Sequence, residues 1–189
     1  MTRSRQTADW GSRAGLAKIV PSSVAVGSGT GSADSLGTVT FTSASSVSVN
    51  GCFTSTYKNY KVLVNLKTST TASVFARMRA SGSDVSANYR NQRLWSFGTT
   101  VGGSSSTTDT GINGNFNVQP ATEFGDFNME ITSPNLAETT RILSIWTCNN
   151  AQETNFINSA LANTTQYDGI SVIASTGTIT GTVTVLGYN

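Results

Sequence analysis

The sequence contains no histidine, only two cysteines and three prolines, and few charged side chains. Without histidine, the chain lacks the commonest general base, the usual Ser–His–Asp triad and the ligand of nearly all zinc sites. Cys52 and Cys148 have no second cysteine near either of them, so neither belongs to a Cys-x-x-Cys redox or zinc motif. They could pair across a sandwich, but two buried free thiols are what we expect in a reducing cytosol.

Long apolar runs are also missing. No stretch reaches the roughly 18 consecutive apolar residues of a membrane-spanning helix, and the basic N-terminus lacks the apolar run of a secretory signal. We therefore expect no membrane insertion and no export signal of the usual type. We also expect no cofactor and no bound metal.

Charged residues make up 12% of the chain, against about 25% in an ordinary soluble domain. Serine and threonine together account for 55 of the 189 residues, so hydroxyl groups must cover much of the surface. Thr, Val, Ser, Asn and Gly are abundant, whereas the residues that usually coat exposed helices are scarce. This composition favours strands and turns and excludes a helical bundle or a coiled coil.

The formal net charge is only +2, but the charges are unevenly distributed. Residues 1–93 contain eleven of the twelve basic side chains and three acids, whereas residues 94–189 contain Arg141 and seven acids. Opposite charges could therefore face each other between neighbouring subunits, or they could mix without consequence in the folded domain.

The first 36 residues differ in pattern from the remainder. They combine basic residues with isolated large apolar side chains and repeated glycines, which predicts an extended N-terminal arm over residues 1–36 that docks on another protein. Its expected anchoring residues are Arg3, Arg5, Trp10, Leu16 and Ile19. The alternative is a disordered tail followed by a flexible Gly/Ser linker.

Residues 37–189 predict one β-sandwich domain, because apolar and polar residues alternate with period two in many short runs. The expected strands cover residues 39–41, 47–49, 60–67, 74–80, 89–97, 112–118, 124–131, 141–147, 167–174 and 178–188. This pattern indicates an all-β, antiparallel β-sandwich of jelly-roll-like type. The absence of an internal repeat disfavours a propeller, a solenoid or a β-helix.

The connections carry their own expectations. Residues 99–111 contain a single large apolar side chain, Val101, and predict a long loop, and residues 152–162 are ambiguous between helix and strand. Residues 175–177 end in a glycine and predict a hairpin turn between the last two strands. Gly181, inside the final strand, predicts a bulge or a close backbone approach.

No arrangement of residues indicates catalysis, so we expect a protein that is not an enzyme. The seven acids of the second half show no spacing that pairs two of them across a sugar, as a glycosidase requires. Glu123 and Asp126 could bind calcium only with help from neighbouring carbonyls, since no Asp-x-Asp-x-Asp loop is present.

A basic and aromatic cluster lies on two consecutive predicted strands. Its members are Arg77, Arg79, Tyr89, Arg90, Arg93 and Trp95. On one sheet face, such residues could contact single-stranded nucleic acid or an anionic glycan. The low overall charge disfavours nucleic acid, and contact with the acidic half of a neighbouring subunit is the preferred interpretation.

Several segments resemble small structural proteins of tailed bacteriophages, of the β-rich fibre, tail-fibre or capsid-surface type. The resemblance rests on residues 2–5, 14–24, 53–64, 87–89 and 185–188, and it is a loose pattern of strand and turn residues. It implies a homotrimer whose N-terminal arm attaches to the virion and whose β domain points outward. It also implies assembly in the host cytoplasm and no shared site residues.

Three functional hypotheses follow. The first is a bacteriophage virion structural protein of the fibre type, on the tail or the head, which contacts itself, other virion proteins and potentially a host-surface glycan. The second is a capsid decoration protein that stabilises the shell in many copies. The third is a carbohydrate-binding module that uses Tyr89, Trp95 and the segment 99–111.

Overall fold

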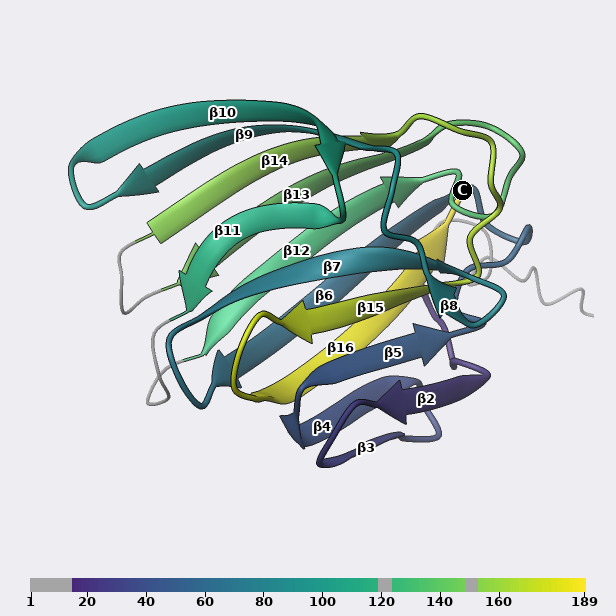
Figure 1. The fold of residues 1–189 in the computed structure, drawn as a ribbon. Helices are drawn as coiled ribbons and strands as arrows, with labels where there is room; N and C mark the ends of the chain where they lie inside the picture. Colours follow the sequence, from purple (N-terminus) through teal and green to yellow (C-terminus); the bar gives the residue numbers. More distant parts are fainter. Residues whose placement is uncertain (1–14, 119–123, 149–152) are drawn as a thin grey trace, which may run out of the picture.

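The computed structural model describes residues 15–118, 124–148 and 153–189, and for residues 113–118 it describes the backbone only. All the strands of these residues belong to two antiparallel sheets, which face each other as a sandwich (Figure 1). Sheet A has the order β10 (Thr100–Asp109), β9 (Tyr89–Phe97), β14 (Glu153–Leu161), β13 (Thr140–Cys148), β12 (Gly125–Thr132), β6 (Asn59–Thr68), β16 (Ile179–Tyr188), β4 (Thr38–Ala44) and β3 (Thr30–Ala33), with β1 (Ala17–Lys18) beside β16. Sheet B has the order β11 (Ile112–Val118), β7 (Ala72–Ala80), β15 (Gly169–Ala174), β5 (Ser46–Asn50) and β2 (Ser23–Val26), with β8 (Ser83–Asp84) beside β7. The predicted all-β sandwich is confirmed.

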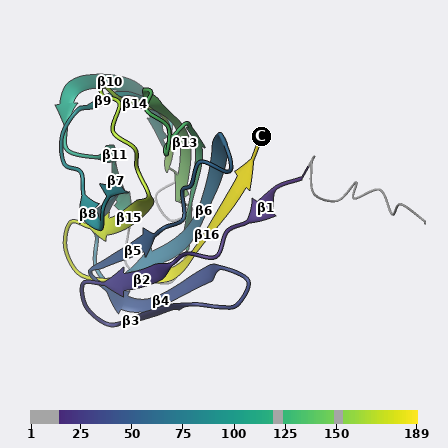
Figure 2. The same cartoon turned by 90° about the vertical axis from the view of Figure 1, so that its right-hand side faces the viewer.

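The two sheets are seen edge-on in Figure 2. Alternate side chains of each long strand point into the space between the sheets, as the period-two patterns predict. In β6, for example, Tyr60, Val62, Val64 and Leu66 are buried, whereas the residues between them are half-buried. The sequence pattern therefore places most of the core correctly.

Aromatic side chains form the centre of this core. The rings of Phe127 and Trp146 meet edge to face with centroids 4.8 Å apart, and those of Phe53 and Tyr60 with centroids 4.9 Å apart. Such pairs add to the free energy that burial alone provides. Both cysteines are buried and free, and burial raises the pKa of the Cys52 thiol.

The N-terminal segment is part of the sandwich over much of its length. β1 pairs with β16, β2 pairs with β5, and β3 pairs with β4. The prediction of an arm over residues 1–36 is therefore wrong for residues 17–33, which belong to the two sheets. Residues 1–14 lie outside the described residues.

In the sequence, the glycines of this segment look like a flexible linker, but in the structure they are required by the backbone. Gly29 has a φ of +67°, and a Cβ placed there would lie 2.2 Å from the carbonyl oxygen of Thr42. Only glycine fits where a left-handed backbone passes so close to another strand. The chain crosses here from β2 in sheet B to β3 in sheet A.

Residues 99–111 are also more ordered than expected. Instead of a long loop, most of this segment forms β10, which pairs with β9 as a hairpin. The segment lacks apolar alternation because β10 is an edge strand whose side chains are mostly exposed. The ambiguous segment 152–162 forms β14, which is a strand in the middle of sheet A.

The connection between the last two strands is not a hairpin. β15 pairs within sheet B and β16 within sheet A, so residues 175–177 carry the chain from one sheet to the other. Gly177 does adopt a positive φ of 64°. Gly181 confirms its prediction, because a Cβ there would lie 2.0 Å from the carbonyl oxygen of Asn65 and the β16–β4 register shifts beside it.

The described part of the chain contains no helix with the length and hydropathy needed to span a membrane.

Candidate functional site

The predicted basic and aromatic cluster does not form one surface. β7, which carries Arg77 and Arg79, belongs to sheet B, whereas β9 belongs to sheet A. The prediction that these residues share a sheet face is wrong, because period two cannot tell which sheet a strand joins. Tyr89 is fully buried, and its hydroxyl accepts a hydrogen bond from the Met78 amide at 2.8 Å.

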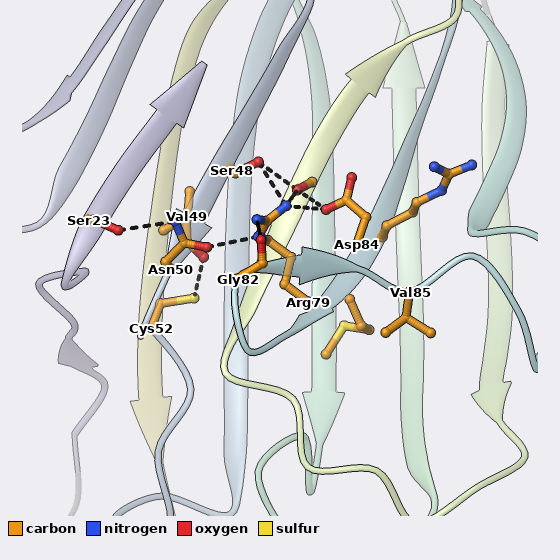
Figure 3. Close-up of polar contacts among 12 residues, drawn as sticks. Ser23, Ser48, Val49, Asn50, Cys52, Arg79, Gly82, Asp84 and Val85 are labelled. Carbon is orange, nitrogen blue, oxygen red and sulfur yellow. Dashed lines mark hydrogen bonds and ion pairs between the residues drawn. The ribbon is translucent and has the colours of Figure 1, made fainter. Parts of the chain in front are cut away.

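Arg79 is the centre of a polar cluster on the outer face of sheet B (Figure 3). Its Nε donates to Asn50 Oδ1 at 2.8 Å, and its Nη1 donates to Ser48 Oγ at 3.1 Å and Ser171 Oγ at 2.9 Å. Nη1 also forms an ion pair with Asp84, and Nη2 donates to the Gly82 carbonyl.

This cluster fixes the turn that joins β7 to β8. The Ser171 hydroxyl donates to Asp84 Oδ1 at 2.7 Å, so the carboxylate is held by both the guanidinium and sheet B. The Arg79 side chain is only 10% exposed, and every guanidinium nitrogen has a partner inside the chain. Arg79 therefore stabilises the fold and is not available as a contact for a subunit or a glycan.

A second buried ion pair lies on the inner face of sheet A. Arg93 donates to Glu153 Oε1 at 3.2 Å and also to Asn155, whose own amide donates to Glu153 at 3.0 Å. Burial lowers the pKa of Arg93, and the Glu153 carboxylate partly compensates. Arg93 also lies 5.9 Å from the centre of the Trp95 ring, which is half-buried.

The other predicted site residues have separate environments. Arg90 is exposed on the outer face of sheet A, and Arg77 donates from the outer face of sheet B to the Thr110 carbonyl at 2.9 Å. Leu16 is 54% exposed, whereas Ile19 is half-buried against the core. Arg3, Arg5 and Trp10 lie outside the described residues.

The described residues contain no cluster that could ligate a metal ion. No group of three or more Cys, Asp or Glu side chains in residues 15–118, 124–148 and 153–189 is placed to hold a metal ion. Asp126 accepts a hydrogen bond from the Asn65 amide at 2.7 Å, and Glu123 lies outside the described residues. The calcium site that these two residues could have formed thus stays untested.

An exposed apolar patch covers part of the outer face of sheet A. Its members, which we call the apolar strip, are Leu94, Val101, Leu143, Ile145 and Phe156. They lie on four adjacent strands, β10, β9, β14 and β13. Each side chain is large, and the exposed fractions run from 41% at Ile145 to 77% at Val101.

The register of sheet A makes the strip continuous. Leu94 lies directly opposite Phe156, which in turn lies opposite Ile145. Leu143 is two residues from Ile145 and therefore points to the same face, next to it. Contiguous exposed patches of this kind are uncommon on monomeric proteins and usually mark an interaction surface.

One stretch of the sequence indicates this strip. Residues 142–146 read Ile-Leu-Ser-Ile-Trp, with large apolar side chains on both faces of one strand. A strand with that pattern is usually buried on both faces. In the described chain only its inner face is covered.

No protein-family model and no curated protein matches the chain. Among solved structures, it is similar to the botulinum neurotoxin serotype G binding domain, with 10% identity, a TM-score of 0.23 and 93% of this chain covered. It spans only 44% of that structure's chain. It is also similar to peanut lectin with a 9mer peptide, with 12% identity, a TM-score of 0.25, and 88% of this chain and 93% of the lectin covered. At these scores neither likeness carries an argument about function.

Proposed function

We propose that this chain is a non-enzymatic structural protein of a bacteriophage particle, of the fibre type, in which copies of the chain pack against each other. The apolar strip is the observation that carries the proposal. Only 12% of the residues are charged, and a chain with so little charge that also exposes five large apolar side chains in one patch gains solubility by covering them.

Charges around the strip favour a further copy of the same chain as the partner. Arg90 lies at one corner of the strip and makes no hydrogen bond or ion pair with the described residues. Asp126 lies toward the opposite corner, on β12, and meets only the neutral amide of Asn65. In a closed trimer, Arg90 of each copy would form an ion pair with Asp126 of the next copy around the ring. The expected assembly is a homotrimer, as the sequence resemblance implies.

Attachment to the particle is assigned to the residues that precede the sandwich. Arg3, Arg5, Trp10 and the exposed Leu16 precede β1 and remain candidate anchoring residues. Ile19 is used for packing within the domain and is no longer an anchoring candidate. The virion partner is another particle protein of the tail, the portal region or the shell.

The copy number of the chain in purified particles tests this proposal. Quantitative mass spectrometry should find the chain at a few per cent of the major shell protein, because fibres are present in few copies. A chain that lacks residues 1–14 should be absent from particles yet remain folded, since β1 and all later strands are retained. Near-equality with the shell protein would instead identify a decoration protein, and absence of the full-length chain would refute a virion role.

A carbohydrate-binding module is the second candidate. It is favoured by Trp95 and Phe97, which point to the same face of β9 and are half-buried and 54% exposed, respectively. A Cβ at Gly102 would lie 2.3 Å from the Trp95 ring, so glycine allows the indole to lie on β10. Tyr89 is excluded from this site because it is buried. Glycan binding that survives Trp95→Ala would contradict this candidate.

A further inference from the structure

A depression of about 300 Å³ lies at one end of sheet A, beside the Leu143 end of the apolar strip. It is lined by Lys58, Thr132, Ser133, Glu138, Thr139 and Arg141. Lys58 immediately precedes β6, Thr132 ends β12, and Arg141 lies at the start of β13. Thr132 and Arg141 are register partners, so their side chains lie next to each other on the outer face.

The segment that closes the depression is held firmly. The Ser133 amide donates to the Lys58 carbonyl at 2.7 Å, and the Tyr167 amide donates to the Pro134 carbonyl at 2.7 Å. The Asn135 side chain donates to the Tyr167 carbonyl at 2.8 Å. These bonds tie residues 133–135 to two other parts of the chain, so the depression is formed before any ligand arrives.

One carboxylate in the depression is fixed in place. Glu138 accepts a hydrogen bond from the Ser133 hydroxyl and lies 3.8 Å from Lys58 Nζ. The Ser133 hydrogen bond, aided by the Lys58 charge, lowers the pKa of Glu138, so this side chain is ionised at neutral pH. It can accept hydrogen bonds from a ligand but does not supply a proton.

The other lining groups make no hydrogen bond or ion pair within the part of the chain that the structure describes. This holds for the Arg141 guanidinium, whose charge contributes to the lowered pKa of Glu138, and for the Thr132 and Thr139 hydroxyls. The three charged side chains, Lys58, Arg141 and Glu138, together carry one net positive charge. An unpartnered planar guanidinium suits a carboxylate, which it binds through two parallel hydrogen bonds.

We propose that this depression binds the acidic monosaccharide unit of a glycan, with the hexuronate carboxylate on Arg141 and the ring hydroxyls on Glu138, Thr132 and Thr139. A neutral sugar leaves the guanidinium without a partner, and the single net positive charge of the lining matches one carboxylate. The volume lies at the lower end of the range of about 300–1,000 Å³ for ligand sites, which fits one sugar unit. The inference stands on this geometry and does not rest on the proposed virion role.

The test is a titration of the full-length ¹⁵N-labelled chain with sodium glucuronate at constant ionic strength, followed by amide chemical shifts. We expect saturable shifts at the amides of Lys58, Thr132 and Thr139, with a dissociation constant in the millimolar range. Arg141→Gln should weaken binding at least about tenfold, and Arg141→Lys should weaken it less, since lysine keeps the charge but loses the fork. Arg77→Gln, on the outer face of sheet B, is the matched control and should bind like the unchanged chain.

Any of four results would overturn the inference. They are equal shifts with neutral glucose, equal affinity for acetate, unchanged binding in Arg141→Gln, and the absence of saturable shifts with glucuronate. Arg141 is exposed, so its replacement should leave the fold intact. The amide spectrum of the variant checks this directly.

Discussion

Replacement of Arg79 by alanine is expected to lower the free energy of unfolding by about 3 kcal/mol. The change leaves the Asp84 carboxylate without its cation and removes hydrogen bonds from Ser48, Asn50 and Ser171. Ser171 is completely buried, so its hydroxyl loses a donor that water cannot easily replace. Urea denaturation followed by circular dichroism and by tryptophan fluorescence measures the loss.

Arg77→Ala is the matched control for this variant. Arg77 lies on the same strand and the same outer face, but among the described residues its only hydrogen bond is with the Thr110 carbonyl, and its guanidinium lies 5.2 Å from the Phe75 ring. We expect its loss to cost less than about 1 kcal/mol. If the two variants lost equal stability, the Arg79 cluster would not have the role assigned to it here.

The strands of the main domain could be predicted because burial on one face imposes period two on the sequence. β6 shows this, since Tyr60, Val62, Val64 and Leu66 are all buried and the residues between them are polar except for Leu63. β10 could not be found in this way. Its backbone pairs with β9 over residues 100–106 and again at Asp109, but its side chains stay mostly exposed, so the sequence shows no alternation.

The sequence pattern could not predict which of the two sheets each strand joins. β7 and β9 are neighbours in the chain, but they belong to different sheets, which separates Arg79 from Arg90 and Arg93. The same limit explains residues 175–177, where a glycine with positive φ serves a crossover instead of a hairpin. A glycine in a short turn looks the same in the sequence whether the turn joins a hairpin or crosses between sheets.

The candidate binding depression could not be predicted from the sequence either. Lys58, Glu138 and Arg141 are separated by up to 83 positions in the sequence, and the antiparallel pairing of β12 with both β6 and β13 brings them together. The apolar strip had a partial signal in residues 142–146, but Leu94 and Phe156 join it only through the register of β9, β14 and β13.

Placing a charge in the apolar strip is expected to disrupt self-association of the chain. Phe156 and Ile145 are opposite each other in the middle of the strip, and each is replaced in turn by aspartate. Burying an unpaired carboxylate in an apolar contact should cost about 3 kcal/mol of association free energy at each site, which weakens the contact more than about a hundredfold. The fold should be retained, because both side chains are exposed in the single chain.

Thr40→Asp provides the matched control. Thr40 is an exposed residue on the same outer face of sheet A, but it lies on β4, several strands away from the strip. The added charge is the same, so any general effect of a new carboxylate on solubility or stability appears in this variant too. We expect it to associate like the unchanged chain.

Sedimentation velocity of the unchanged chain, Phe156→Asp and Thr40→Asp at the same concentrations tests the central claim most directly. The account predicts that the unchanged chain and Thr40→Asp sediment as an oligomer, with three times the 19.8 kDa chain mass for a trimer, and that Phe156→Asp sediments as a monomer. An unchanged chain that stays monomeric at all concentrations, or a Phe156→Asp variant that associates as well as Thr40→Asp, would contradict the claim that the apolar strip holds copies of this chain together.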